Sequence, residues 1–147
     1  MMKPYLLISA CLLGEPCRYD GKSKPLDENI LSAIRSAYEL VAVCPEVAGG
    51  LPTPRVPSER KGRRVLRRDG EDVTSYYGRG AAEALALVRK YDIKLALLKE
   101  RSPSCGVGRI YDGTFSGTLT DGDGTTAELL KAEGIKVIGE SEAEKII

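Results

Sequence analysis

Three of the four cysteines in this chain stand where a predicted β-strand has just ended. In a sheet of parallel strands, the carboxyl ends lie side by side and form the crevice where ligands bind. We therefore expect three thiols that are far apart in the sequence to meet at one point, where they could hold a metal or an iron–sulfur cluster. They are Cys11 after the apolar run 5–10, Cys44 after 40–43, and Cys105 in the loop that follows 95–98.

The chain contains no histidine, which excludes the commonest general base and the commonest metal-ligating nitrogen. Zinc usually takes four protein ligands, often in pairs two residues apart, and the cysteines lack that spacing. Iron–sulfur clusters accept thiolates from dispersed positions, and a cluster held by three thiolates leaves one iron open as a Lewis acid. The alternative is that the cysteines are small buried apolar residues, a common fate of free cysteine.

Length and composition predict one domain spanning residues 1–147, able to bury about 70% of its unfolded surface without disulfides. A signal peptide is not expected, and no apolar run approaches the roughly 18 residues of a membrane helix. We expect a cytoplasmic, reducing setting with no membrane partner, where thiols are more often reactive or metal-bound than paired. The net charge of +1 predicts no global attraction to nucleic acid. The local exception is Arg60, Lys61, Arg63, Arg64, Arg67 and Arg68.

Short apolar runs alternate with helical patterns along the chain. This order predicts the α/β class, as a single three-layer Rossmann-like domain with a mostly parallel sheet and a small β-hairpin. We place the hairpin at 110–115, because Asp112-Gly113 favours a tight turn. Helices are predicted at 27–39, at 72–91 and from 123 or 125 to 134, and a fourth strand at 135–138.

Six sequence blocks follow one another along the chain: SACLLG at 9–14, CRYDG at 17–21, VCPEV at 43–47, GGLPTPR at 49–55, SPSCG at 102–106 and IYDGTF at 110–115. In this order they resemble the thiouracil desulfidase family, and the resemblance extends from Leu6 to Ile138. It implies an oxygen-sensitive [4Fe-4S] cluster whose ligands are Cys11, Cys44 and Cys105 and whose free iron takes the sulfur of a thiolated pyrimidine.

The same resemblance implies that Glu46 and Ser102 are the catalytic side chains. Replacing C=S by C=O in thiouracil or a thiouridine nucleotide needs water and no net redox change, and we expect Glu46 to activate that water. Arg18, Arg55 and Ser104 are predicted to bind the substrate, since arginine suits a phosphate. Ordinary alternatives remain open: Glu46 as a surface acid, and Ser102 as a turn residue.

Other functions stay open at this point. The chain could be a nonenzymatic module that binds zinc or carries persulfide for a partner. The basic stretch 60–68 leaves a nucleic-acid substrate open, although a solvated hairpin edge is favoured there. For Cys17 we favour a structural role over that of a fourth ligand, and the oligomeric state is not predicted.

Overall fold

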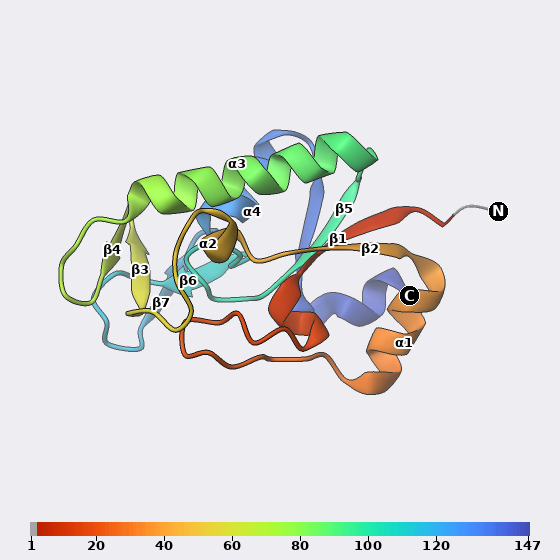
Figure 1. Ribbon diagram of the computed structural model, residues 1–147, viewed down its shortest axis with the longest axis horizontal. Coiled ribbons are helices and arrows are strands. Elements are labelled where there is room, and N and C mark those ends of the chain that lie inside the picture. The colour runs from red at the N-terminus through yellow and green to blue at the C-terminus, as the bar shows by residue number, and fades with distance from the viewer. Residues whose placement is uncertain (1–2) are drawn as a thin grey trace.

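Four parallel strands form the centre of the protein, in a computed structural model that describes residues 3–147 (Figure 1). Each strand pairs in parallel with its neighbours, and β1 lies between β2 and β5. Leu7 is paired with Val41 on one side and with Ala96 on the other. The predicted α/β class and mostly parallel sheet are confirmed. The strand order is β2 (Glu39–Val43), β1 (Tyr5–Ser9), β5 (Leu95–Leu98) and β8 (Lys136–Gly139).

Helices cover both faces of this sheet because the strands are apolar on both sides. In β1, Leu7 packs into the cluster formed with α3 and α4, whereas Leu6 and Ile8 pack into the cluster formed with α1 and η2. In Figure 1, α3 lies above the strands and α1 lies below them. No helix within residues 3–147 combines the length and apolarity needed to cross a bilayer. The covering helices are α1 (Glu28–Ala37), α3 (Thr74–Tyr91), α4 (Thr125–Ala132) and η2 (Glu140–Ile146).

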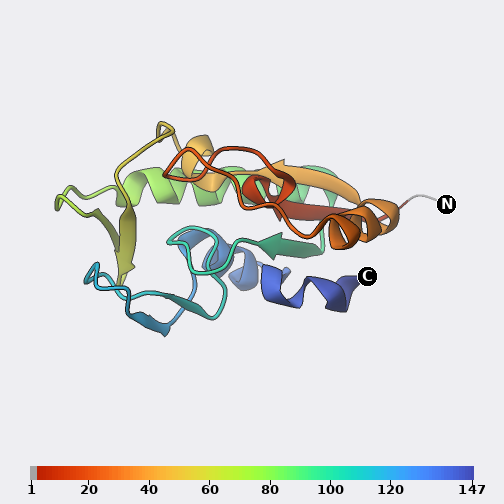
Figure 2. The same ribbon diagram turned by 90° about the horizontal axis from the view of Figure 1, so that it is seen from below.

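Two antiparallel hairpins lie beyond the carboxyl ends of the strands. Seen from below, the arrows of the central strands point toward them (Figure 2). One hairpin pairs β3 (Ser58–Lys61) with β4 (Arg64–Arg67), and the other pairs β6 (Arg109–Tyr111) with β7 (Leu119–Asp121). The edge of the sheet and the hairpins therefore face the same region of the molecule.

The predicted tight turn at Asp112-Gly113 is wrong. Tyr111 pairs with Leu119, so the connection between β6 and β7 spans residues 112–118. The Asp112 carboxylate accepts a hydrogen bond from the Thr114 backbone N–H at 3.0 Å, which makes a local turn on one side of the loop. Glu59 of β3 accepts hydrogen bonds from the N–H groups of Gly113 and Phe115, so contacts with the neighbouring hairpin set the loop's shape.

Helix boundaries differ slightly from those predicted. Helix α1 begins at Glu28 because the Asp27 carboxylate caps it, accepting from two backbone N–H groups, and it ends at Ala37 because Glu39 enters the sheet. Helix α4 ends at Ala132 rather than at residue 134. Three short elements were not predicted, and two of them follow strands of the site: η1 (Ala10–Leu13) after β1, and α2 (Pro45–Ala48) after β2. The third is η2, after β8.

Candidate functional site

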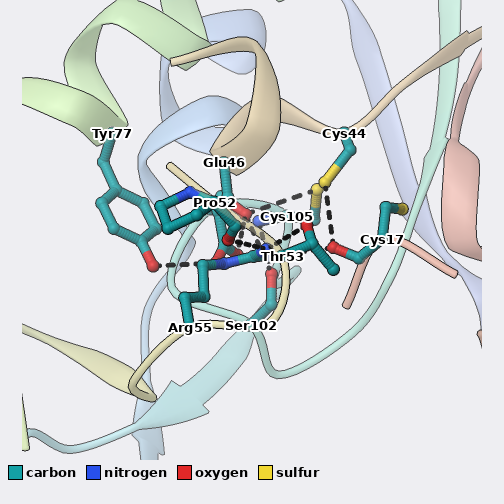
Figure 3. A network of polar contacts seen from close by, with 10 residues as sticks. Cys17, Cys44, Glu46, Pro52, Thr53, Arg55, Tyr77, Ser102 and Cys105 are labelled. Carbon is teal, nitrogen blue, oxygen red and sulfur yellow. Dashed lines mark hydrogen bonds and ion pairs between the residues drawn. The ribbon is translucent and has the colours of Figure 1, made fainter. Parts of the chain in front are cut away.

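The carboxyl ends of β1, β2 and β5 border a cavity of about 500 Å³. Cys11, Cys44 and Cys105 all line this cavity, although 94 positions separate Cys11 from Cys105 in the sequence. Cys17 lines it as well, because the chain after η1 folds back over the sheet edge. Three of the thiol-bearing residues are seen together in Figure 3. All four cysteines are free rather than disulfide-bonded.

Each cysteine is positioned by a different local feature. Cys11 lies within η1 and is buried. Cys44 is the residue before α2, where Pro45 occupies the first helical position and suits a helix start. Cys105 is only 4% exposed, and its backbone N–H donates to Ser102 Oγ at 2.7 Å. The loop that carries Cys105 is thus held by one of its own side chains.

The environment of Cys17, Cys44 and Cys105 favours the neutral thiols. Burial raises the pKa of Cys105 to about 12. A hydrogen bond with Cys11 is the main cause that raises the pKa of Cys17 to about 11, and a hydrogen bond with Cys17 is the main cause that raises the pKa of Cys44. A metal that binds these residues as thiolates must displace their protons.

The donor set suits an iron–sulfur group better than a single ion. Among residues 3–147, no three cysteine, aspartate or glutamate side chains are arranged to hold one metal ion. Zinc needs its ligands about 2.3 Å from one point. Thiolates spread around a cavity match a cluster, whose irons are separate from one another. Cys11, Cys44 and Cys105 could hold such a group, and Cys17 lies beside them.

Glu46 lies in the first turn of α2 and is 9% exposed. Its Oε1 accepts from Arg55 Nε at 3.0 Å and from the Tyr77 hydroxyl at 2.9 Å, and its Oε2 accepts from Ser104 Oγ at 2.8 Å. Figure 3 shows Arg55 and Tyr77 converging on the carboxylate. The arrangement therefore presents a carboxylate beside the thiols that three side-chain donors hold in place.

Two glycines allow Tyr77 to reach Glu46. A Cβ on Gly80 of α3 would overlap the Pro45 carbonyl oxygen, and one on Gly49 would overlap the Tyr76 carbonyl oxygen. The absence of side chains there lets α2 and α3 approach closely. Tyr77 lies in the helix predicted at 72–91, but no role at the site was predicted for it. Its hydroxyl could have indicated such a role, because a buried tyrosine hydroxyl needs a hydrogen-bond partner.

Ser102 and Ser104 line the cavity together with Glu46. Ser104 is 2% exposed, and its Oγ lies 3.3 Å from Ser102 Oγ. Ser102 is partly exposed and lines the cavity. The structure directs the Ser104 hydroxyl to Glu46, so the substrate contact predicted for Ser104 remains untested.

Arg55 is the most heavily bonded of the predicted substrate-binding residues. Besides Glu46, its guanidinium donates to the carbonyl oxygens of Pro52 and Cys17 and to Thr53 Oγ1, at 3.0–3.1 Å. Its side chain is 6% exposed. Arg55 therefore ties the loop after α2 to Cys17, and all three of its side-chain nitrogens already have protein acceptors.

Other cations remain at the cavity. Arg18, predicted to bind substrate, lines it. Of the basic stretch 60–68, Arg64 pairs with Asp72 and its side chain is 65% exposed, as expected for a solvated hairpin edge. Arg60 differs from that expectation, because its side chain is only 10% exposed and pairs with Glu128. Arg68 differs, because it lines the cavity with its guanidinium 5.6 Å from the centroid of the Phe115 ring. The further cations of the lining are Lys24, Lys99 and Arg101.

Comparison with known proteins agrees with the chemistry of the site. A sequence model of the 2-thiouracil desulfurase family matches residues 6–142. The chain belongs to this family. The resemblance inferred from the sequence blocks is therefore confirmed.

Two relatives of this family member cover nearly its whole length. A solved structure of a [4Fe-4S]-dependent thiouracil desulfidase, TudS, is 50% identical to it and superposes with a TM-score of 0.94, over 98% of this chain and 95% of that one. A Bacillus subtilis (strain 168) protein described as uncharacterized protein YbbK is 42% identical over 152 residues, covering 97% of this chain and 99% of the relative. The parallel sheet and its two helical layers are thus shared with a solved desulfidase structure.

Proposed function

We propose that this protein removes sulfur from a thiolated pyrimidine such as thiouracil, converting C=S to C=O by a hydrolysis without net redox change. One observation carries the proposal: three thiols from separate strand ends and a buried carboxylate line one cavity. The fold around that cavity is shared with TudS at 50% identity. Sulfur-rich and histidine-free, the site has the donors for an iron–sulfur cofactor and a carboxylate for proton transfer.

The proposed cofactor is a [4Fe-4S] cluster held by Cys11, Cys44 and Cys105. When bound by three thiolates, such a cluster supplies a Lewis-acidic iron without a protein ligand, toward which a thiocarbonyl sulfur is a suitable donor. Cys17 is assigned a supporting role: its backbone carbonyl accepts from Arg55 Nη2 at 3.0 Å and lies 3.6 Å from Cys44 Sγ. The Cys17 carbonyl therefore connects Cys44, a proposed cluster ligand, with Arg55. Arg55 in turn pairs with Glu46.

Glu46 is proposed as the base that accepts a proton from the attacking water, and Ser102, which also lines the cavity, as the second catalytic side chain. Arg55 and Tyr77 hold Oε1 of Glu46, which fixes the direction of Oε2. A base held in this way is oriented before the substrate arrives, and general-base catalysis of this kind contributes about 10²–10⁴-fold.

We extend the proposed substrates to thiouridine nucleotides. The cavity of about 500 Å³ is lined by six cationic side chains against three carboxylates, and Arg18 is among the cations. Such an excess of positive charge favours a substrate that carries a phosphate. Arg55, whose donors are occupied, positions Glu46 in this scheme rather than binding the phosphate.

The experiment is anaerobic purification followed by iron, labile-sulfide and zinc analysis and by an assay with thiouracil. We expect about four irons and four sulfides per chain, with uracil and sulfide formed in equal amounts. Cys44→Ala should abolish the cluster, whereas Cys17→Ala, the matched control from the same cavity, should keep most of it. Stoichiometric zinc without labile sulfide, or a fully loaded protein that releases no sulfide, would refute the proposal.

A further inference from the structure

The hydroxyls around Glu46 have hydrogen positions that can be deduced from their partners. Ser104 Oγ donates to Glu46 Oε2 at 2.8 Å, so the Ser104 O–H points at the carboxylate. Ser104 Oγ then has lone pairs left, and in the 3.3 Å contact with Ser102 it is the acceptor. Ser102 Oγ in turn accepts from the Cys105 N–H at 2.7 Å, which leaves its own hydrogen free to point at Ser104.

These hydrogen bonds all run in one direction, from Ser102 toward Glu46. All three residues line the cavity; Ser102 is partly exposed, whereas Ser104 is 2% and Glu46 9% exposed. Oε1 of Glu46 already accepts from Arg55 and from Tyr77, which is 1% exposed. Oε2 is therefore the oxygen left for proton transfer, and the protein group bonded to it is Ser104.

We propose that Ser104 relays protons between Ser102 and Glu46, and that Tyr77 is a positioning residue that holds Glu46 for this relay. The inference rests on the proposed function and deepens it, by assigning the path through which Glu46 acts. Ser104 is thereby given a role other than the substrate contact predicted from the sequence.

The proton balance of the relay is simple. As the water oxygen bonds to the ring carbon, a water proton passes to Ser102 Oγ, the Ser102 proton passes to Ser104 Oγ, and the Ser104 proton passes to Glu46 Oε2. Both hydroxyls are unchanged at the end, and Glu46 is neutral. The carbon–sulfur bond then breaks with its electron pair going to sulfur, which takes the second water proton and leaves as HS⁻. Glu46 returns its proton to solvent along the same hydroxyls, and no atom changes its oxidation state.

The competing path is direct transfer from water to Oε2, which has a further lone pair. The two paths differ in what Ser104→Ala does. In the relay, this change breaks the path; in direct transfer, it frees Oε2 for water. The long 3.3 Å contact between the two hydroxyls is consistent with a relay that tightens when substrate binds, as catalytic hydrogen bonds often do.

The test compares turnover, normalised to iron content, for Ser104→Ala, Glu46→Gln and the double variant. The relay predicts that Ser104→Ala lowers kcat by about 10²-fold with KM changed less than about threefold. It also predicts that the double variant is no slower than Glu46→Gln alone, since residues that act as one unit are not additive. Tyr77→Phe should lower kcat by a smaller factor at unchanged iron content.

The matched control is Thr126→Val. Thr126 is fully buried next to Ser104, whose carbonyl accepts from the Thr126 N–H at 2.9 Å, and within residues 3–147 its Oγ1 has no hydrogen-bond partner. This control should leave kcat and iron content unchanged. Ser104→Thr, which keeps the hydroxyl, should recover part of the lost rate.

A second readout does not depend on turnover. Infrared difference spectra of the cluster-free protein, with Glu46→Gln identifying the carboxylate bands, should show the Glu46 stretch shifted by Ser104→Ala and by Tyr77→Phe and not by Thr126→Val. The inference is overturned if Ser104→Ala keeps kcat within about threefold of the parent, if the losses of the two single variants multiply in the double variant, or if the band does not move. Failure of every variant and of the parent to release sulfide would refute the proposed function instead.

Discussion

Arg55→Met tests whether the buried ion pair holds the site together. The Arg55 side chain is 6% exposed and that of Glu46 is 12% exposed, with 3.0 Å between Nε and Oε1. Removing one partner of a buried pair leaves an uncompensated charge and costs about 3–5 kcal/mol. Tyr77 and Ser104 still donate to the carboxylate, so we expect the lower end, about 3 kcal/mol.

The assay is urea denaturation of the cluster-free protein under reducing conditions, because iron would add its own stabilisation. With a slope of about 1–3 kcal/mol per molar urea, the expected loss lowers the midpoint by at least about 1 M. Arg64→Met is the matched control, since Arg64 pairs with Asp72 at 3.0 Å but its side chain is 65% exposed. Solvent screens that exposed pair, so its loss should leave the urea midpoint nearly unchanged.

A double-variant cycle separates the charge pair from lost packing. Glu46→Gln in the Arg55→Met background removes the uncompensated charge, so the double variant should be more stable than the sum of the single losses by about 1–3 kcal/mol. The reasoning is refuted if Arg55→Met costs no more than Arg64→Met, or if the two losses simply add.

Three further predictions concern catalysis, pH and substrate. Glu46→Gln should keep the cluster while turnover of thiouracil falls by about 10²-fold or more, measured as hydrolysis rate per iron; near-normal turnover would remove Glu46 from the mechanism. The cluster-free protein should lose stability as pH rises from about 9 through about 12, because burial raises the pKa of Cys105 from its ordinary value to about 12 and the folded state binds that proton more tightly. Urea midpoints between pH 8 and 11 measure this, and Cys105→Ala should flatten the decline; an unchanged slope would contradict it. Arg18→Ala should raise KM for a thiouridine monophosphate by about tenfold and leave KM for the free base within about twofold; equal effects on both would argue against phosphate binding.

The strand-end position of the site could be predicted from the sequence because it depends on local patterns. Apolar runs mark the strands, and parallel strands share one edge, so Cys11, Cys44 and Cys105 were expected to converge, and they line one cavity. The family resemblance rests on contiguous blocks and was confirmed for the same reason. The number of domains and the roles of the individual site residues remain predictions.

Contacts between distant segments decided the rest. Asp112-Gly113 favours a tight turn by itself, but Glu59 of another hairpin binds the N–H groups beyond it, and a longer loop results. Cys17 was not among the thiols expected to converge, yet it lines the same cavity, and its carbonyl accepts from Cys44 Sγ at 3.6 Å. Local propensity contains no information on such partners.

The sequence by itself determined the layered α/β fold, the family and the sheet edge that carries the sulfurs. Only the tertiary structure decided what surrounds Glu46: the Arg55 guanidinium, the Tyr77 hydroxyl and the Ser104 hydroxyl. The physical reason is that a side-chain hydrogen bond depends on distances of about 3 Å and on direction. Those are set by how closely α2 packs against α3, which two glycines permit and no periodic pattern reveals.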